Sequence, residues 1–409
     1  MTPVHTLIIG AGDRGNTHAS YSKAFPDEMN IVAVAEPDPV KRAAFAKEYQ
    51  LKIDRCFQSW EQALAVEKQA DAVIICTQDQ MHAAPAKKAL KKGYHVLLEK
   101  PMGTTEKECR ELAVAAEQSN KIFGICYVLR YTAHYQKMKE IIDSGLIGEV
   151  VTIEHLEAVN YAHMAHSYVR GSWARSETSS PMILAKSCHD TDLMRWLVGK
   201  RCKRIASFGA LTHFKKENAP IGSTKRCIDG CEVEQDCPYS ALKLYLDMDQ
   251  SGWPVNTITN DLSRTGREKA LKEGPFGRCV YHSDNNVVDH QVVAMEFEGQ
   301  ITASFTMSAF TQGSRRTRIM GTMGETTGDM DTITVTNFRN NNSETVWKEN
   351  NNDERGHGGG DFGLLKQFLK AVRTNDTTLF EPSIEISLES HLIALAAEHS
   401  RLTNAVVEL

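Results

Sequence analysis

Three glycines, Gly10, Gly12 and Gly15, form the first group of residues whose types and spacing could serve chemistry, in "LIIGAGDRG". A tight turn needs one glycine, whereas a backbone that approaches a bulky anion needs more. Gly10 permits the turn, Gly12 lets the backbone approach a pyrophosphate, and Gly15 lets the next helix pack closely on the strand. The free amides at the start of that helix would face the phosphates. The spacing predicts a dinucleotide-binding loop, and a tight turn without a ligand is the alternative.

An acidic residue follows at the distance that such a loop requires. Glu36 ends the next apolar run, 21 residues after Gly15. A carboxylate there accepts hydrogen bonds from both ribose hydroxyls and repels a 2′-phosphate, which favours NAD over NADP. Lys41 and Arg42 lie nearby and leave NADP possible.

The segment "LLEKPMG" places Lys100 at the end of another apolar run. Ligands of open α/β sheets bind at the carboxyl ends of the strands, and Pro101 fixes the backbone so that Lys100 projects into that crevice. His82, in "CTQDQMH", is expected either to cap a helix or to lie at the edge of the cofactor. With the three glycines and Glu36, the residues expected to contact the cofactor are Asp13, Arg14, Thr77, His82, Glu99 and Lys100.

The segment "MILAKSCHDTDLMRWLVG" carries a candidate proton relay. His189 and Asp192 have helical spacing, and a histidine titrates near neutral pH, so His189 can move a proton from a substrate hydroxyl. The alternative is a core histidine at the start of a helix.

Aromatic, histidine and arginine side chains gather in "NYAHMAHSYVRGSWARSETSS". Aromatics mixed with polar donors suit a sugar ring, and two arginines suit an anionic group. The alternative is an ordered arm that packs on another subunit. Further along, "HGGGD" opens a helix that Asp361 could cap. The candidate substrate-binding residues are Arg130, Tyr161, His163, His166, Arg170, Trp173, His357 and Asp361.

The elements that must position these residues divide the chain at about residue 125. Residues 1–125 alternate short apolar strands with helices, which predicts a parallel sheet with right-handed crossovers. Residues 126–409 contain strands of period two, such as "QITASFTMSAF", in which Ala303, Phe305 and Met307 share one face. The expected fold class is therefore α/β: a Rossmann domain followed by an α+β domain with an open, mostly antiparallel sheet.

A cysteine-rich insertion of little periodicity lies near residues 213–286. It is too long for a structureless loop in a compact domain. Its cysteines, Cys227, Cys231, Cys237 and Cys279, could bind a structural zinc ion with four thiolates. Four reduced thiols in a helical excursion are the alternative.

Composition narrows the class of protein. The 409 residues carry a net charge of −5, which argues against nucleic acid as a partner. No apolar stretch approaches the roughly 20 residues of a membrane span, and the first thirty residues do not resemble a signal peptide. We therefore expect a cytoplasmic enzyme with no membrane partner.

The segments "GAGDRG", "VAVAEPD", "LLEKPMG" and "CHDTDLMRWLVG" together resemble the Gfo/Idh/MocA oxidoreductases, in that family's order. The resemblance implies hydride transfer between NAD(P) and a sugar, polyol or related carbonyl, with Lys100 and His189 as catalytic residues. It also implies a homodimer or homotetramer formed through the open sheet. Relatives carry a catalytic aspartate four residues before the histidine, whereas this chain has Ala185 there, followed by Lys186. This departure implies either a changed acid–base arrangement in which Lys186 or Asp190 takes part, or a substrate that differs from the polyols of the better-known members.

Two other functions stay open. The segment "HGGGD" and the changed position at Ala185 suggest an NAD-dependent glycoside hydrolase that oxidises the sugar transiently at C3 before elimination. A non-catalytic NAD sensor is the third hypothesis, although it should lack the lysine and histidine that this chain has.

Overall fold

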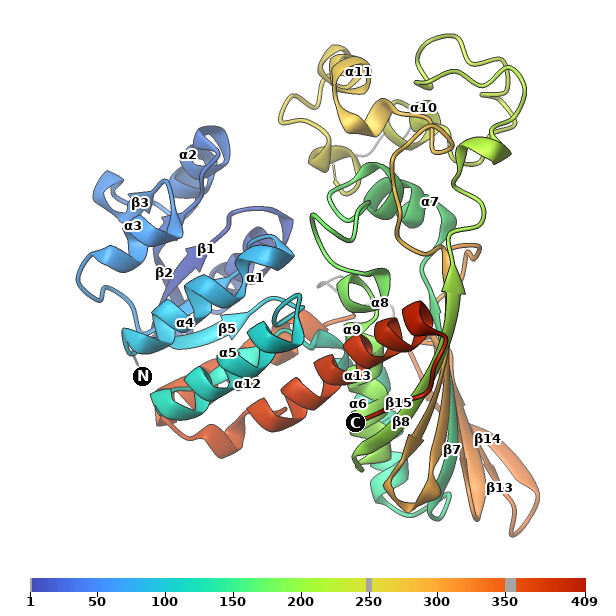
Figure 1. Cartoon of the computed structure of the whole chain (residues 1–409). Helices are drawn as coiled ribbons and strands as arrows, with labels where there is room; N and C mark the ends of the chain where they lie inside the picture. The colour runs from blue at the N-terminus through green and yellow to red at the C-terminus, as the bar shows by residue number, and fades with distance from the viewer. Residues whose placement is uncertain (1, 248–251, 350–357) are drawn as a thin grey trace.

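The computed structural model of the chain describes residues 2–247, 252–349 and 358–409. Two sheets lie side by side in it, the first built from the N-terminal part of the chain and the second from the later part (Figure 1). The two halves meet near the ends of the strands that carry the predicted site.

The first sheet is parallel, with strand order β3-β2-β1-β4-β5-β6 in the described residues. Its buried strands are rich in Val, Ile, Leu and Ala, as expected where both faces are covered by helices. This confirms the predicted Rossmann sheet, and adds a two-residue edge strand that the apolar pattern did not reveal. The strands are β1 (Val4–Ile9), β2 (Met29–Ala35), β3 (Cys56–Phe57), β4 (Ala72–Ile75), β5 (His95–Leu98) and β6 (Phe123–Ile125).

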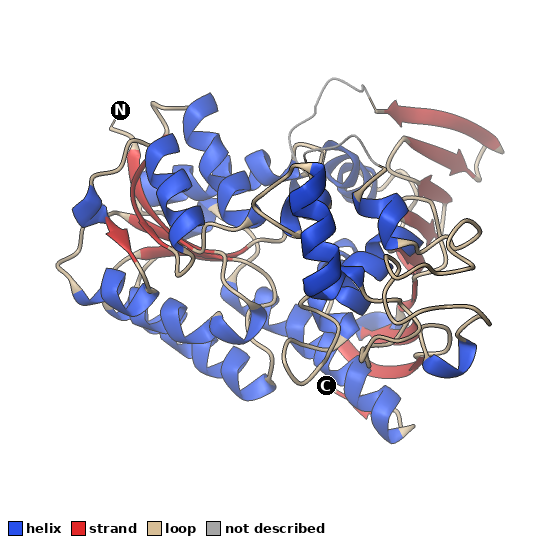
Figure 2. Ribbon diagram, turned by 90° about the horizontal axis from the view of Figure 1, so that it is seen from above, coloured by secondary structure: helices blue, strands red, loops and turns tan. Residues whose placement is uncertain are grey.

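Helices cover both faces of this sheet (Figure 2). One of them comes from the far end of the chain: Leu364 and Phe368 of α12 share a buried apolar cluster with Ile8 of β1. The domain boundary near residue 125 stays a prediction, but the chain returns to the first sheet after building the second. The helices around the sheet are α1 (Asp13–Ala24), α2 (Pro39–Glu48), α3 (Trp60–Ala65), α4 (Ala83–Lys91), α5 (Glu106–Ser119) and α12 (Gly360–Thr374).

The second sheet is mixed and mostly antiparallel, with order β14-β13-β12-β11-β7-β10-β9-β8-β15 in the described residues. Among the strands that the structure describes in this sheet, only β10 and β7 pair in parallel. In β10, Ala303, Phe305 and Met307 are buried whereas Thr302 and Ser304 are exposed, which confirms the predicted alternation. The strands are β7 (Val150–Ala158), β8 (Cys202–Ala210), β9 (His290–Phe297), β10 (Thr302–Ser308), β11 (Arg316–Gly321), β12 (Gly324–Gly328), β13 (Thr332–Asn337), β14 (Asn342–Lys348) and β15 (Val407–Glu408).

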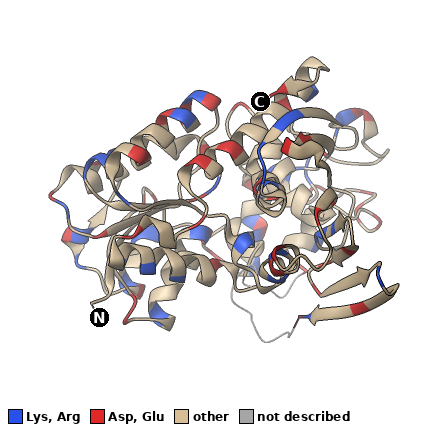
Figure 3. Cartoon of the chain, turned by 90° about the horizontal axis from the view of Figure 1, so that it is seen from below, with Lys and Arg blue, Asp and Glu red and all other residues tan. Residues whose placement is uncertain are grey.

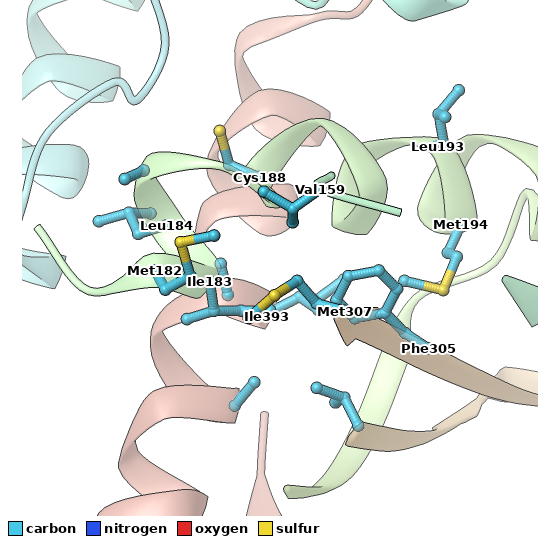
Figure 4. Close-up of a cluster of buried hydrophobic side chains, with 14 of the residues drawn as sticks. Val159, Met182, Ile183, Leu184, Cys188, Leu193, Met194, Phe305, Met307 and Ile393 are labelled. Atoms are coloured by element: carbon cyan, nitrogen blue, oxygen red, sulfur yellow. The ribbon is translucent and has the colours of Figure 1, made fainter. Parts of the chain in front are cut away.

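Helices pack on the inner face of the second sheet. Figure 4 shows Phe305 and Met307 of β10 meeting Met194 of α9 and Ile393 of α13, all of which are fully buried. Packing in this core fixes the positions of α8 and α9 relative to the first sheet. The helices on this side are α6 (Ala133–Asp143), α7 (Tyr161–His163), α8 (Met182–Ala185), α9 (Cys188–Val198) and α13 (Ile384–Thr403), and a π-helical segment spans Met164–Arg170.

The insertion contains α10 (Ala241–Tyr245) and α11 (Arg264–Glu273), and lies beyond α7 in Figure 1. Its own apolar core is small, with Cys227, Tyr245 and Leu271 among the five buried side chains. Because this core is small, the position of the insertion depends on its contacts with residues 160–180, which lie before α8 and are called the arm below.

Basic and acidic residues are interleaved along the helices of both halves of the chain (Figure 3). In the part of the chain that the structure describes, no helix combines the length and the apolar character needed to cross a membrane.

Candidate active site

The glycine loop forms the cradle that its spacing predicts. Gly10 has a φ of +93°, and a Cβ there would lie 2.5 Å from the carbonyl oxygen of Cys76. A Cβ on Gly15 would lie 1.9 Å from the carbonyl oxygen of Gly10, so both positions require glycine. A Cβ on Gly12 would meet no atom within 4 Å, and Gly12 caps α1 without a side-chain hydrogen bond. The open backbone at this helix N-terminus suits a diphosphate.

Glu36 fixes the loop to the end of β2. Its Oε2 accepts a hydrogen bond from the Ala11 N–H at 2.8 Å, and its Oε1 accepts one from the Asp38 N–H at 2.9 Å. Each carboxylate oxygen has a second acceptor position, which a ribose hydroxyl can use. The guanidinium of Arg42 donates to the carbonyl oxygen of Glu36. The loop and Glu36 therefore fit a nicotinamide dinucleotide.

Arg14 belongs to a largely buried ion-pair network, and its contact with the cofactor stays a prediction. Its Nε lies 2.7 Å from Glu99 Oε1, and its Nη2 lies 2.5 Å from Asp361 Oδ1. His18 Nε2 lies 2.8 Å from the same Glu99 oxygen. Burial opposes the charge of Glu99, but Arg14 and His18 outweigh it and hold the pKa of Glu99 well below its usual value. The network locks α12 to the end of β5.

Asp361 is not the N-cap residue of α12. Gly359 is the N-cap of α12 and provides no side-chain cap, while the Asp361 carboxylate, fully buried, holds Arg14. A buried carboxylate pairs with an available guanidinium rather than with helix amides, because the ion pair offsets its desolvation. His357, the other candidate in this segment, lies outside the described residues.

The same network contains a group with metal-ligand geometry. Among the described residues, His18, Glu99 and Cys126 are the one set of three possible ligands whose atoms lie within 4.8 Å of one another. Arg14 already supplies a positive charge to that carboxylate. Burial also raises the pKa of the Cys126 thiol well above its usual value, so the thiol stays protonated.

Lys100 joins the two halves of the site. It follows β5, and its Nζ donates a hydrogen bond of 2.5 Å to the carbonyl oxygen of Ala185 at the end of α8. His82 braces the neighbouring loops, because its Nδ1 lies 2.6 Å from the Pro101 carbonyl oxygen and its Nε2 lies 2.9 Å from that of Thr77. The structure therefore brings the lysine to the position where relatives carry the aspartate.

His189 lies in the first turn of α9 and is 8% exposed. Its ring meets that of Tyr127 edge-on, with centroids 6.3 Å apart. The Tyr127 hydroxyl is in turn 2.7 Å from His391 Nδ1, and Nε2 of His391 accepts from the Met102 N–H at 2.7 Å. His189 is thus packed against residues that are anchored to the loop after Lys100.

A charged network lies beside Lys100, and the sequence pointed to Lys186 and Asp190 but not to Glu157, Arg315 or His155. Lys186 Nζ lies 3.3 Å from Glu157 Oε1, whose other oxygen is 2.6 Å from Arg315 Nη2. Arg315 Nε continues to Asp190 Oδ1 at 2.8 Å, which also lies 2.9 Å from His155 Nε2. Five ionisable groups from β7, α9 and the loop before β11 therefore share one buried region.

Burial lowers the pKa of Lys186 below its ordinary value; Glu157 opposes this shift, whereas Arg315 and Lys100 add to it. Asp190 responds in the opposite way to its neighbours: burial disfavours its charge, but Arg315 and His155 bring its pKa below the ordinary value. Lys186 therefore loses its proton more readily than an exposed lysine does.

The alternation of apolar and polar residues in β7 is the sequence signal that could have placed Glu157 in this network. Ile153, His155 and Glu157 occur two residues apart and all three are buried, so they share the inner face. A glutamate on the apolar face of a strand needs a partner there. That argument predicts a buried cation, but it does not say which one.

His163 is the arm residue that reaches the charged region. Burial lowers its pKa well below the usual value, and the nearby charges of Lys186 and Lys100 add to the effect. Its ring meets the ring of Trp253 edge-on, with centroids 5.0 Å apart. Trp253 belongs to the insertion and is 45% exposed.

Arg130 has a buried partner rather than an open guanidinium. Its Nε and Nη2 donate to the two oxygens of Asp192 at 2.6 and 2.7 Å, and it lies 5.3 Å from the ring of Trp196. This bidentate pair fixes α9 to the segment after β6.

The other arm candidates hold the arm in place. His166 hydrogen-bonds to Tyr245 and Arg170 to the backbone of Tyr239, both in the insertion. Trp173 donates to Asp79 Oδ1 at 3.1 Å in the first domain. Tyr161 packs edge-on against Tyr239.

Two of the residues expected to contact the cofactor lie elsewhere, in the first domain. Asp13 is exposed in the first turn of α1, and Thr77 donates to the Met81 carbonyl oxygen at 3.0 Å.

The arm and the insertion also enclose a cavity of about 460 Å³. Arg170, Arg175 and Arg278 line it, together with Phe276 and Asp284. The Nε of Arg170 donates a hydrogen bond to the Arg278 carbonyl oxygen at 2.7 Å, so two residues that line the cavity are bonded to each other.

The four cysteines of the insertion lie near one another. Cys227 and Cys279 each follow one partner of the backbone bridge between Arg226 and Arg278. Cys227 is close enough to Cys237 and Cys279 that its ionisation adds to the effect of burial in raising the pKa of both thiols. No three of the four sulfur atoms reach the 4.8 Å mutual separation of metal ligands in the described residues. The structure gathers these thiols without closing them into a tetrahedral site.

The fold and the site define a dinucleotide-dependent oxidoreductase with a Rossmann domain and a second α/β domain. The sequence model of the Gfo/Idh/MocA oxidoreductase family, with an NAD-binding Rossmann fold, matches residues 4–127. The model of that family's C-terminal alpha/beta domain matches residues 139–391. The chain belongs to this family and is an NAD(P)-dependent dehydrogenase.

Known proteins similar to this chain carry corresponding names. The "Putative oxidoreductase YteT" of Bacillus subtilis is 26% identical over 73% of this chain and 70% of its own length. The D-glucoside 3-dehydrogenase of Escherichia coli is 28% identical over 36% of this chain and 42% of its own length. The scyllo-inositol dehydrogenase of Lactobacillus casei, solved with NAD(H) and scyllo-inositol, has a TM-score of 0.69 at 20% identity over 100% of this chain and 99% of its own.

Proposed function

We propose that this dehydrogenase transfers a hydride between the nicotinamide and a hydroxyl-bearing carbon of a sugar, polyol or derivative. The observation that carries this proposal is the hydrogen bond from Lys100, which follows β5 at the carboxyl edge of the first sheet, to the carbonyl oxygen of Ala185, the residue before Lys186. The similar D-glucoside 3-dehydrogenase and inositol dehydrogenases support the class of substrate.

Gly10, Gly12, Gly15 and Glu36 would hold the dinucleotide, and NAD(P), when bound, exchanges a hydride with the substrate carbon. Lys100 holds and polarises the reacting oxygen, and its hydrogen bond to Ala185 fixes the direction of its side chain. His189 relays the proton of the substrate hydroxyl.

Lys186 and Glu157 take the place of the carboxylate that Ala185 lacks. Glu157 reaches this region from β7 and pairs with Lys186 at 3.3 Å. A lysine that loses its proton more easily than usual can exchange it with Lys100 or with the substrate. Arg315 and Asp190 keep Glu157 and Lys186 oriented.

The test uses the purified enzyme with NAD and a panel of free sugars, polyols and sugar acids, followed by absorbance of the reduced nicotinamide. Net formation of the reduced cofactor supports the proposal. Release of the aglycone from chromogenic glycosides without net reduced cofactor contradicts it and favours the hydrolase. Cofactor binding with inertness in both assays favours the sensor. The structure adds nothing to the hydrolase hypothesis, since Asp361 of "HGGGD" binds Arg14.

We also propose that the open face of the second sheet forms a homodimer or homotetramer interface. Phe208 of β8 and Val292 of β9 are direct cross-strand partners and are 69% and 44% exposed. Exposed apolar neighbours on a flat sheet favour burial against another subunit. Sedimentation of the wild type and of Phe208→Asp tests this, with a monomeric wild type as the contrary result.

A structural zinc ion bound by Cys227, Cys231, Cys237 and Cys279 is a separate proposal. It rests on the grouping of the thiols and on the small apolar core of the insertion. Binding requires the side chains to close by rotation. A cytoplasmic location is proposed because all ten cysteines are free, as is usual in a reducing compartment.

A further inference from the structure

The insertion places one aromatic side chain beside the charged region without burying it. Trp253 is 45% exposed, while its neighbours His166 and Tyr245 are buried. Its ring meets those of His163 and His166 edge-on, with centroids 5.0 and 5.2 Å away. A tryptophan held by two rings and still open to solvent has an accessible apolar surface in a fixed place.

The segment that carries Trp253 is anchored rather than loose. His166 Nδ1 lies 2.7 Å from the Tyr245 hydroxyl, and its Nε2 lies 3.2 Å from Thr257 Oγ1. Phe276 stacks on the same imidazole, with centroids 5.0 Å apart. Three separate parts of the insertion therefore converge on one arm residue, and they fix Trp253 relative to His163.

His163 connects this aromatic surface to the reacting groups. Its ring contacts Trp253 and also Tyr168, with centroids 5.0 and 5.7 Å away, and Tyr168 meets Trp173, which donates to Asp79 in the loop after β4. The charges of Lys186 and Lys100 add to the effect of burial in lowering the pKa of His163. A ligand group bound against Trp253 would therefore be separated by His163 alone from the sugar ring whose reacting oxygen Lys100 is proposed to hold. A substrate of a single small ring would leave this surface unused.

We propose that Trp253 forms a second subsite, which binds the sugar ring or aryl group attached to the reacting sugar, so that the substrate is a glycoside or oligosaccharide. This inference rests on the proposed function, since it extends the substrate from the reacting ring to its neighbour. Sugar rings have an apolar face that packs on an indole, and their hydroxyl edge can reach His163.

The experiment compares methyl and p-nitrophenyl glycosides of glucose, galactose, mannose and glucuronic acid, bound to the enzyme loaded with NADH. Tryptophan fluorescence and calorimetry measure the dissociation constants without turnover. We expect one sugar pair in which the p-nitrophenyl glycoside binds roughly tenfold more tightly than the methyl glycoside. Trp253→Ala should reduce this preference to about threefold or less, and Trp253→Phe should keep most of it.

Ile221→Ala is the matched control, since Ile221 is a 99% exposed apolar residue of the same insertion. It should keep the wild-type preference. Thermal unfolding of each variant shows whether the fold is retained, and the loss of ligand-induced quenching in Trp253→Phe locates the signal. An equal preference in wild type and Trp253→Ala overturns the inference, as does the absence of binding by every pair.

The two proposals fail differently. If no carbohydrate is oxidised but the aryl preference depends on Trp253, the proposed hydride transfer fails and the subsite stands. If sugars are oxidised and Trp253→Ala leaves the preference unaltered, the subsite fails and the proposed function stands.

Discussion

Lys186 Nζ lies 3.3 Å from Glu157 Oε1, across the gap between the segment after α8 and strand β7. The two residues are 29 positions apart in the chain. The pair places a carboxylate and an ammonium group next to Ala185, whose carbonyl oxygen accepts a hydrogen bond from Lys100.

Glu157→Gln should move the pH dependence of kcat/KM. Glu157 stabilises the protonated form of Lys186, so its neutralisation lowers the pKa of Lys186 further. If protonated Lys186 is the active form, the alkaline limb should move to lower pH by about one unit or more. Glu154→Gln is the control, because Glu154 lies on the same strand but on its exposed face. An unshifted limb would remove Glu157 from the mechanism.

Lys100→Met should lower kcat by about 10²- to 10⁴-fold, because it removes the group that polarises the reacting oxygen. The dissociation constant of NADH should change by less than about threefold, or 0.7 kcal/mol. Stopped-flow kinetics and NADH fluorescence measure the two effects. Lys107→Met, at a side chain 85% exposed, is the control. A collapse of NADH binding would make Lys100 a cofactor ligand instead.

Glu36→Ala should weaken NADH binding by about tenfold and reduce discrimination against NADPH. The substitution removes the acceptor of the Ala11 and Asp38 N–H groups and the charge that repels a 2′-phosphate. Fluorescence titration with both cofactors measures the ratio of the dissociation constants. Asp27→Ala, an exposed carboxylate before β2, should leave the ratio unchanged. The same ratio in Glu36→Ala and wild type would refute the role.

Glu99 should make the stability of the protein depend on acid pH. Its folded pKa lies well below the ordinary value of 4.5, so its contribution is complete above about pH 4.5 and is lost as the pH falls toward the folded pKa. Glu99→Gln should therefore flatten the decline in unfolding free energy at roughly pH 5 to 3. At pH 7 it should cost about 3 kcal/mol, because Arg14 and His18 lose a buried partner.

Urea unfolding at several pH values measures this contribution. Glu111→Gln breaks a surface pair with Lys87 and should cost less than about 1 kcal/mol. Parallel pH curves for wild type and Glu99→Gln would show that Glu99 is not the group responsible.

The purified protein should contain about one zinc ion per chain if the four cysteines close on a metal. Cys237→Ser and Cys279→Ser should each release it and lower the thermal midpoint, whereas Cys56→Ser, outside the insertion, should not. Elemental analysis and a chelator titration measure the content. A wild-type protein that contains no zinc, and whose thermal midpoint equals that of Cys237→Ser and Cys279→Ser, would refute the site.

The predictable part of the site is the part that one local segment specifies. Gly10, Gly12 and Gly15 belong to one strand–turn–helix unit, so their spacing already implies their geometry. Lys100 at the end of β5 follows from the same rule. The substrate candidates stay predictions, and their spacing did not indicate the distant partners that Arg130, Arg170 and Trp173 have in the structure.

The sequence by itself determined the parallel Rossmann sheet, the alternation of β10 and the cradle for a dinucleotide, because hydrophobic period and glycine spacing act over short distances. The tertiary structure alone decided that α12 completes the first domain, that Asp361 holds Arg14, and that Glu157 meets Lys186. These are pairings of buried charges and apolar faces between distant segments. Any one of several partners could satisfy each group, and only the packing of the whole chain selects which one does.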